Sequence, residues 1–127
     1  MTILLDTCEF LWLVSGDSRL SVHAANALRN PENAVYLSVV SSWEISIKHS
    51  LGKLPLPQSP DIFVPLQRQR HGIDILNLDE AAVGLLAKLP AHHKDPFDRM
   101  LVCQAQAYGM TLLSSDPLIR KYSVPIL

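Results

Sequence analysis

The sequence predicts an α/β domain in which a parallel β-sheet carries helices on both of its faces. Short apolar or β-branched runs alternate with helical patterns along the whole chain, which is the order typical of strand–helix–strand units. The length of 127 residues suits one domain with a full α/β core. No repeat, low-complexity segment or linker divides the chain, so residues 1–127 are expected to form a single domain.

Five segments are predicted to be strands because they are short, apolar and mostly bounded by turn or capping residues. These segments are residues 3–5, 35–40, 73–76, 111–114 and 124–127. The last of them contains Pro125. Proline lacks a backbone N–H donor, so this segment is predicted to form an edge strand.

The predicted helices are bounded by capping residues and by prolines or glycines. They are expected at residues 7–14, 21–29, 41–51, 61–70, 79–89 and 97–108, with a further helical turn from 116. Asp95 is placed as an N-cap, with Pro96 in the first helical position that proline favours. Trp43, Ile47 and Leu51 are spaced by four residues, which predicts one buried apolar face.

The composition is apolar and nearly neutral. Apolar residues make up 48 % of the chain and charged residues 18 %, against roughly 25 % charged residues in average proteins. Such an apolar surplus indicates a face covered by a second copy or by a partner. The net charge of −1 excludes a global basic field that would attract nucleic acid. No signal peptide and no membrane span of about 18 apolar residues is found, so a cytoplasmic protein is expected.

The two cysteines, Cys8 and Cys103, lie within apolar helical patterns. They are predicted to be buried, unpaired and reduced. The two tryptophans, Trp12 and Trp43, are likewise predicted to lie in the core and not to act as base-stacking platforms. The adjacent pair His92-His93 is expected to meet a phosphate or to have no role, because neighbouring side chains seldom point at one ion.

Four acidic residues, Asp6, Glu44, Asp98 and Asp116, stand where predicted helices begin. The carboxyl ends of parallel strands share one edge of a sheet, where ligands bind. Asp6 and Asp116 follow strands, and the helix capped by Asp95 begins at the same edge. Converging carboxylates disfavour one another's ionised form, and Mg²⁺ accepts their oxygens as ligands. The pattern therefore predicts a metal site for phosphodiester chemistry.

Each acid also has a purely structural interpretation. Glu44 stands three residues after Ser41 in a capping-box spacing, so its carboxylate could reach back to the Ser41 amide. Asp6 and Asp116 could be N-caps, and Asp98 could interact with the positive end of a helix dipole. The shared position of all four at one ligand edge favours the metal site over four unrelated caps.

Four segments together resemble a known family. They are Leu4-Leu5-Asp6-Thr7, Ser42 to Lys48 with Leu51 to Leu54, His92 to Arg99, and Leu112 to Asp116. In this order and at this length they resemble PIN-domain ribonucleases, specifically the toxin half of VapC-type toxin–antitoxin pairs. The resemblance covers nearly the whole chain.

This resemblance implies a three-layer fold with a five-stranded parallel sheet in the order 3-2-1-4-5. It implies Mg²⁺ or Mn²⁺ held by Asp6, Asp98 and Asp116, with Glu44 completing the site. It also implies cleavage of RNA, single-stranded or structured, and inhibition by a cognate antitoxin. An alternative is a catalytically inactive PIN-fold module that binds RNA or protein.

Three further residues are expected to serve such a site. Thr7 and Ser114 could hydrogen-bond the carboxylates, and Arg99 could bind RNA phosphates through its forked guanidinium. A homodimer is expected, with antitoxin chains laid over exposed apolar surface as amphipathic helices. A haloacid-type phosphatase is not favoured, since it would need an aspartate where Cys8 stands.

Overall fold

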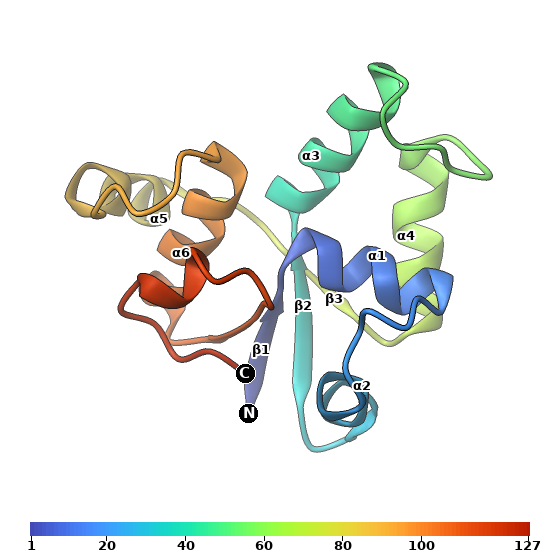
Figure 1. Cartoon of the computed structure of the whole chain (residues 1–127), viewed down its shortest axis with the longest axis horizontal. Coiled ribbons are helices and arrows are strands. Elements are labelled where there is room, and N and C mark those ends of the chain that lie inside the picture. Colours follow the sequence, from blue (N-terminus) through green and yellow to red (C-terminus); the bar gives the residue numbers. More distant parts are fainter.

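A four-stranded parallel sheet with the order β3-β2-β1-β4 forms the middle of the molecule. The computed structural model describes residues 1–127 and is shown in Figure 1. The strands are β1 (Thr2–Leu5), β2 (Ala34–Ser38), β3 (Asp74–Leu76) and β4 (Thr111–Leu113). In the register, Leu4 of β1 lies between Tyr36 of β2 and Leu112 of β4. The predicted parallel α/β architecture is therefore confirmed.

The predicted fifth strand at residues 124–127 is wrong. This segment makes only an isolated parallel bridge, between Ile126 and Leu112. The Leu112 amide donates to the Pro125 carbonyl at 2.9 Å, and the Leu127 amide donates to the Leu112 carbonyl at 3.0 Å. Proline has no N–H to donate, so the ladder cannot extend along the segment. The chain end occupies the position of a fifth strand without forming one.

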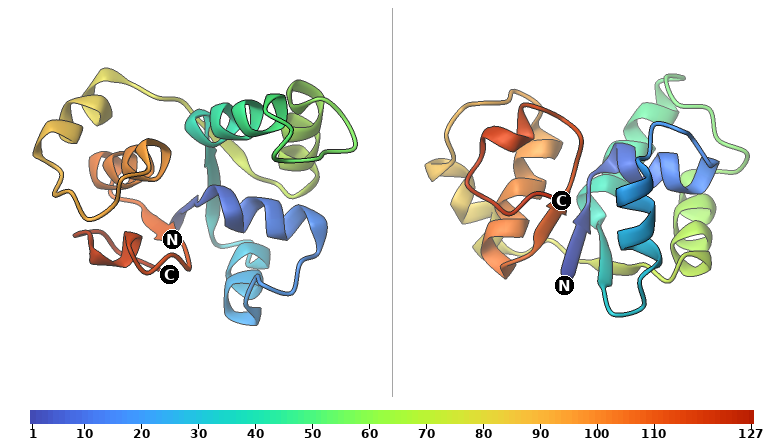
Figure 2. Two further views of the ribbon diagram at one scale, coloured as in Figure 1. Left: turned by 45° about the horizontal axis from the view of Figure 1, so that its top comes forward. Right: turned by 60° about the horizontal axis from the view of Figure 1, so that its bottom comes forward.

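Helices cover both faces of the sheet (Figures 1 and 2). They are α1 (Thr7–Ser15), α2 (Val22–Arg29), α3 (Val39–Ser50), α4 (Pro60–Arg70), α5 (Glu80–Gly84) and α6 (Pro96–Tyr108), with 3₁₀ turns η1 (Leu85–Lys88) and η2 (Ile119–Lys121). Ile3 and Leu5 of β1 pack in one hydrophobic cluster with Phe10 of α1, whereas Leu4 packs in a second cluster with Leu101 of α6. This alternation confirms the three-layer arrangement.

Helix α3 begins two residues earlier than predicted, and its buried face differs. The Ser38 hydroxyl accepts from the Val40 amide at 3.0 Å and so caps the helix, whose first residue is Val39. The β-branched residues Val39 and Val40 favour a strand in the sequence. They follow the Ser38 cap, however, and form the first turn of the helix. Glu44 and Ile45 are buried, whereas Trp43 is 59 % exposed. The prediction of a buried Trp43 and the alternative interpretation of a capping box at Ser41 are therefore wrong.

The segment predicted as one helix at 79–89 is divided. Helix α5 ends at Gly84, and the 3₁₀ turn η1 follows it. Glycine has a low helix propensity, and it stands where the α-helix ends. No helix of the molecule is long and apolar enough to cross a lipid bilayer.

A buried hydrogen bond joins the two helices that carry Glu44 and Asp98. The Ser38 hydroxyl, at the start of α3, donates to Oε1 of Gln104 in α6 at 2.6 Å, and both residues are fully buried. Ser38 thus caps one helix and satisfies a buried amide oxygen of another.

Substituting Ser38→Ala is expected to lower the free energy of unfolding by about 2–3 kcal/mol, because it removes the cap and leaves the Gln104 oxygen buried without a donor. Urea unfolding followed by circular dichroism measures this loss. The control is Ser46→Ala on the exposed side of α3, where the hydroxyl only donates to the Ser42 carbonyl; its expected effect is within about 0.5 kcal/mol. Equal effects of the two variants would contradict the role given to Ser38.

Candidate metal centre

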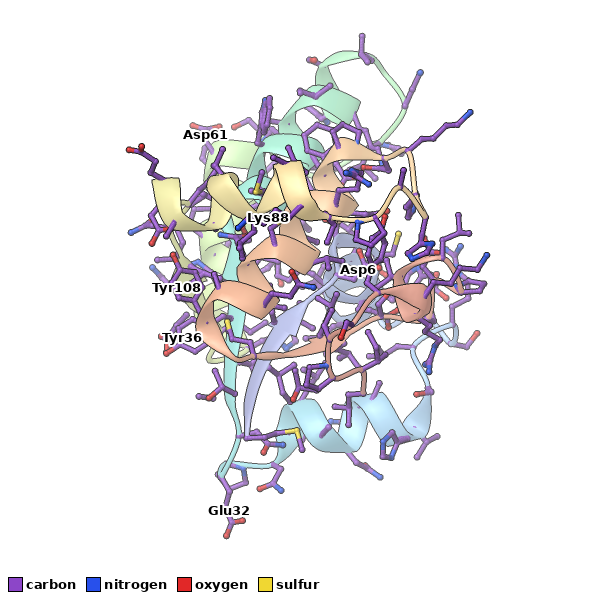
Figure 3. The ribbon with its side chains drawn as sticks, turned by 90° about the vertical axis from the view of Figure 1, so that its left-hand side faces the viewer. Asp6, Glu32, Tyr36, Asp61, Lys88 and Tyr108 are labelled. Carbon is purple, nitrogen blue, oxygen red and sulfur yellow. The ribbon has the colours of Figure 1, made fainter.

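The four predicted acids line one cavity of about 250 Å³ at the carboxyl edge of the sheet. Asp6 directly follows β1, Asp116 lies beyond β4, Asp98 stands in the first turn of α6, and Glu44 stands in α3. Figure 3 shows Asp6 near the middle of the molecule and Glu32 at its far tip. The remaining residues that line the cavity are Cys8, Trp12, Lys48, Asp95 and Ser115. The topology therefore brings together residues that are up to 110 positions apart.

Asp6 occupies the N-cap position of α1 but does not cap it. Its side chain makes no capping hydrogen bond, and its Oδ2 atom accepts from the Ser114 hydroxyl at 2.8 Å. Burial raises the pKa of Asp6 to about 6, and the nearby carboxylates of Glu9 and Glu44 add to the rise. The predicted contact of Ser114 with a carboxylate is confirmed. The capping interpretation is wrong for Asp6.

Asp95 does the capping for α6 and leaves Asp98 free to face the cavity. The Oδ1 atom of Asp95 accepts from the backbone amides of Phe97 at 2.9 Å and of Asp98 at 3.1 Å. Burial raises the pKa of Asp98 to about 7, with further contributions from Asp6, Asp95 and Glu44. Asp98 is thus a mostly buried acid in the electrostatic field of its neighbours, and the predicted cap at Asp95 is confirmed.

Glu44 presents one carboxylate oxygen that nothing in the protein satisfies. The Oε2 atom lies 2.5 Å from the Lys48 ammonium, one helical turn further along α3. The Oε1 atom is buried and has no hydrogen-bond partner. A buried polar atom without a partner is costly and calls for an explanation. A cation bound in the cavity would supply the missing partner.

Asp116 serves the turn that follows it and also faces the cavity. Its Oδ1 atom accepts from the Leu118 amide at 2.8 Å, so it caps the turn that leads into η2. Its Oδ2 atom lies 3.1 Å from Nε2 of His93. The capping interpretation therefore holds for one oxygen of Asp116, and the other oxygen belongs to the cluster.

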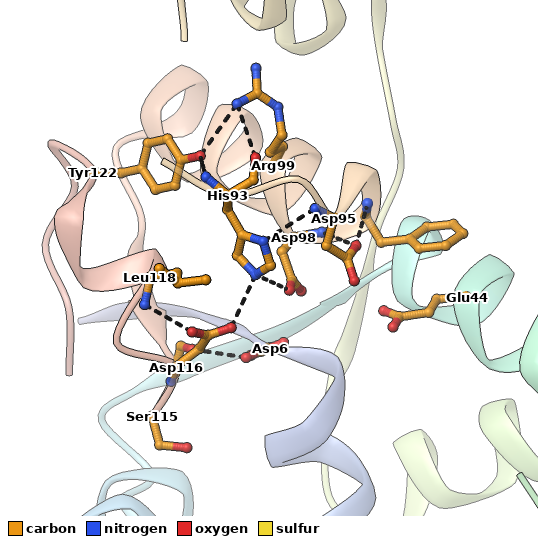
Figure 4. A network of polar contacts seen from close by, with 12 residues as sticks. Asp6, Glu44, His93, Asp95, Asp98, Arg99, Ser115, Asp116, Leu118 and Tyr122 are labelled. Atoms are coloured by element: carbon orange, nitrogen blue, oxygen red, sulfur yellow. Dashed lines mark hydrogen bonds and ion pairs between the residues drawn. The ribbon is translucent and has the colours of Figure 1, made fainter. Parts of the chain in front are cut away.

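The sequence patterns did not indicate that two further residues, His93 and Glu9, belong to this region. His93 reaches the cluster, with Nε2 at 3.0 Å from Asp98 Oδ2 and 3.1 Å from Asp116 Oδ2 (Figure 4). Glu9 is buried, and its Oε1 atom accepts from the amide and the hydroxyl of Ser115 at 3.0 and 2.8 Å. The spacing of Glu9, three residues after Asp6, was the available signal, because it puts both on one side of α1.

The other expected participants are placed differently. The Thr7 hydroxyl donates to the Ser41 hydroxyl at 2.8 Å and not to a carboxylate. The Arg99 guanidinium donates to the Pro90 carbonyl at 2.9 Å and to the Tyr122 hydroxyl at 3.3 Å. Arg99 therefore holds the loop before α6, and contact with RNA remains a prediction. Cys8 is exposed at the cavity, so its predicted burial is wrong, whereas Cys103 is buried as expected.

The donor set fits a hard divalent cation. The cavity offers carboxylate oxygens from Asp6, Glu44, Asp98 and Asp116, and Mg²⁺ and Mn²⁺ favour such ligands. Burial first, and neighbouring carboxylates second, raise the pKa values of Asp6 and Asp98, and one buried oxygen of Glu44 has no partner. Cation binding would relieve each of these three features.

Residues 3–125 match the family model of the PIN domain. The chain belongs to the PIN domain family. Among curated proteins, Ribonuclease VapC16 of Mycobacterium tuberculosis is 39 % identical over 67 residues. That match spans 50 % of this PIN domain chain and 48 % of the relative, about half of each.

Solved structures share the fold over nearly the full length. A chain from VapBC2 of Rickettsia felis, bound to a promoter DNA fragment, has a TM-score of 0.74 and 12 % sequence identity. The match covers 100 % of this chain and 98 % of the Rickettsia chain. A chain from VapBC-1 of nontypeable Haemophilus influenzae has a TM-score of 0.67 and 16 % identity, with coverages of 100 % and 97 %. At these identities the likeness shows the PIN fold.

The metal-free protein is expected to lose stability as pH rises. Asp6 and Asp98 have folded-state pKa values of about 6 and about 7, above their ordinary value of 3.8. Their stabilising contribution is fully present below pH 3.8 and is lost as pH rises through 6 and 7. Between pH 5 and 8 the free energy of unfolding should fall by on the order of 2–4 kcal/mol.

Urea unfolding in EDTA across this pH range measures the change. The Asp6→Asn variant should show a flatter profile than the wild-type protein, which separates the carboxyl contribution from that of the five histidines. A wild-type stability that is constant or rising between pH 5 and 8 would contradict the assignment.

Proposed function

We propose that this PIN domain protein is a metal-dependent endoribonuclease and the toxin component of a toxin–antitoxin pair. The observation that carries the proposal is the convergence of four carboxylates on one cavity, one of them with a buried and unpartnered oxygen. The relative named Ribonuclease VapC16 supports RNA as the substrate. The neighbours titled VapBC support a paired antitoxin.

In the proposed reaction, Mg²⁺ or Mn²⁺ would lower the pKa of an attacking water and stabilise negative charge on the scissile phosphate. Asp6, Asp98 and Asp116 would hold the cation, and Glu44 would complete the site. The Ser114 hydroxyl fixes the orientation of Asp6. Because Asp6 and Asp98 have raised pKa values, the carboxyls release protons on binding the cation, so its affinity should rise with pH.

RNA would reach this acidic cavity through a small number of cationic side chains. Lys48 lines the cavity, and its side chain is 46 % exposed. Lys94 is exposed on the loop before α6. Lys94 is better placed to meet a phosphate directly, since the Arg99 guanidinium donates to the Pro90 carbonyl and the Tyr122 hydroxyl and the Lys48 ammonium is paired with Glu44. Substrate binding in this proposal depends on few phosphate contacts.

Substitution of Asp98→Asn is expected to abolish RNA cleavage and to preserve the fold. It removes a ligand oxygen and one repelling charge, so the metal-free variant should be at least as stable as the wild-type protein. Cleavage of an RNA panel with Mg²⁺, Mn²⁺ or EDTA measures activity. The matched control is Asp61→Asn, which removes the same charge from an exposed site at the start of α4 and should leave cleavage unchanged.

Cleavage by the Asp98→Asn variant at the wild-type rate would contradict the metal centre. Absence of divalent-dependent cleavage of every panel RNA by the wild-type protein would favour the alternative, a catalytically inactive PIN-fold module that binds RNA or protein.

An apolar groove is the proposed binding site of the antitoxin. It measures about 450 Å³ and lies between α1, α4 and the connector that precedes α4. Its apolar side chains are Leu11, Trp12, Val14, Leu54, Leu56 and Phe63, with prolines 55 and 57 beside them. A groove of this kind suits the apolar face of an amphipathic helix. A second apolar surface, on α3, exposes Trp43 at 59 % and Leu51 at 61 % and is proposed for the homodimer.

The two surfaces can be tested separately. Light scattering at tens of micromolar should give a dimer for the wild-type protein and a monomer for Trp43→Ser. Leu56→Glu should remain dimeric but should lose binding to the protein encoded by the adjacent gene, because it places a charge in the apolar groove. A strictly monomeric wild-type protein would contradict the dimer, and undiminished partner binding by Leu56→Glu would contradict the groove.

A further inference from the structure

The imidazole of His93 contacts polar groups through both of its nitrogen atoms. His93 lies in the loop between η1 and α6, and its side chain is mostly buried. The Nδ1 atom lies 3.1 Å from the backbone amide nitrogen of Asp95. The Nε2 atom lies between Asp98 and Asp116 (Figure 4). Because the two nitrogens face different kinds of partner, the contacts identify which nitrogen carries the proton.

The amide of Asp95 can only donate a hydrogen bond, so Nδ1 of His93 has to accept it. An accepting nitrogen carries a lone pair and no proton. With Nδ1 accepting from the Asp95 amide, the ring N–H is the one on Nε2.

With the proton on Nε2, His93 donates to Oδ2 of Asp116 at 3.1 Å, and Oδ2 of Asp98 lies 3.0 Å from the same nitrogen. These three side chains offer ligand atoms within 4.8 Å of one another, which is the spacing of a metal triad. A cation on Nε2 would need the lone pair there, however, and would move the proton to Nδ1. That proton would point at the Asp95 amide hydrogen.

We propose that His93 is a positioning residue of the carboxylate cluster and not a ligand of the cation. Its Nε2–H group hydrogen-bonds one oxygen of Asp116 and stands beside one oxygen of Asp98, so the imidazole fixes where these two carboxylates meet. The cation is then left with the remaining oxygens of the cluster, so the site presents oxygen ligands alone. Hard cations such as Mg²⁺ suit such a set, whereas a histidine ligand would favour Zn²⁺. The inference about the cation depends on the proposed function, but the assigned tautomer does not.

The loop that carries His93 is held at several points. The His93 amide donates to the Tyr122 hydroxyl at 2.9 Å. Arg99 binds the same hydroxyl at 3.3 Å and the Pro90 carbonyl at 2.9 Å. The amide that fixes Nδ1 belongs to Asp95, whose side chain caps α6. Rotation of the imidazole would therefore break contacts on the ring, and displacement of the loop would break contacts on its backbone.

Nitrogen-15 NMR of the imidazole groups tests the tautomer directly. Two-bond correlations from ring protons distinguish a protonated Nε2 from a protonated Nδ1, and a His93→Gln spectrum assigns the signal. At pH 7.5 the metal-free protein should show His93 with the proton on Nε2. Saturating Mg²⁺ should leave that proton in place. A proton on Nδ1, an imidazolium, or loss of the Nε2 proton on adding Mg²⁺ would overturn the proposal.

Mg²⁺ affinity measured by calorimetry gives a second test. Glutamine keeps an N–H donor near the position of Nε2 but offers no imidazole nitrogen. His93→Gln should therefore bind Mg²⁺ within about threefold of the wild-type protein, whereas His93→Ala should bind about tenfold more weakly, the loss typical of outer contacts to ligands. Equal losses in the two variants would indicate a ligand and overturn the proposal.

Two controls complete the design. His71→Ala, an exposed residue at the end of α4, should not change Mg²⁺ affinity. Tyr122→Phe removes the acceptor of the His93 amide and should weaken affinity less than His93→Ala. If the wild-type protein bound no Mg²⁺, the metal centre itself would fail, while the metal-free NMR spectrum would still decide the His93 assignment.

Discussion

Electrostatic repulsion among the carboxylates at the sheet edge is the constraint around which the neighbouring structure is arranged. Each acid has a compensating group of a different kind. Glu44 has the Lys48 ammonium, Asp6 has the Ser114 hydroxyl, and Asp98 and Asp116 share the His93 imidazole. None of these contacts removes the charge, and the pKa values of Asp6 and Asp98 remain raised. The protein is thus arranged to tolerate the cluster, and a cation would complete its neutralisation.

The compensating groups come from segments that are distant in sequence, so they depend on the parallel order of the strands. β1 and β4 are neighbours although 105 residues lie between them, and this pairing brings Ser114 to Asp6. The loop before α6 is brought to Asp116 by contacts that involve Tyr122, close to the chain end. Tyr122, in the segment that follows η2, therefore contributes to the geometry of the site.

Much of this fold could be predicted from local patterns, because apolar strands, helix caps and glycine stops are encoded by neighbouring residues. The gathering of the four acids could be predicted as well, since it follows from the parallel order alone. The beginning of α3 could not, because Val39 and Val40 favour a strand locally and only the Ser38 cap decides against it. The tautomer of His93 depends on a single amide hydrogen bond, which no residue spacing indicates. Trp43 is exposed because α3 turns Glu44 and Ile45 toward the interior, and its apolar spacing with Ile47 and Leu51 did not indicate that orientation.

Helices α3 and α6, which deliver Glu44 and Asp98, are joined at two levels. Near the cavity, the rings of Trp43 and Phe97 meet edge to face with centroids 4.9 Å apart. Six residues from each acid, the Ser38 hydroxyl donates to Gln104 at 2.6 Å. These two contacts resist both sliding and splaying of the helices. The separation of Glu44 and Asp98 is thereby set by the packing of the two helices, so the size of a cation that the proposed site would accept depends on this helix pair.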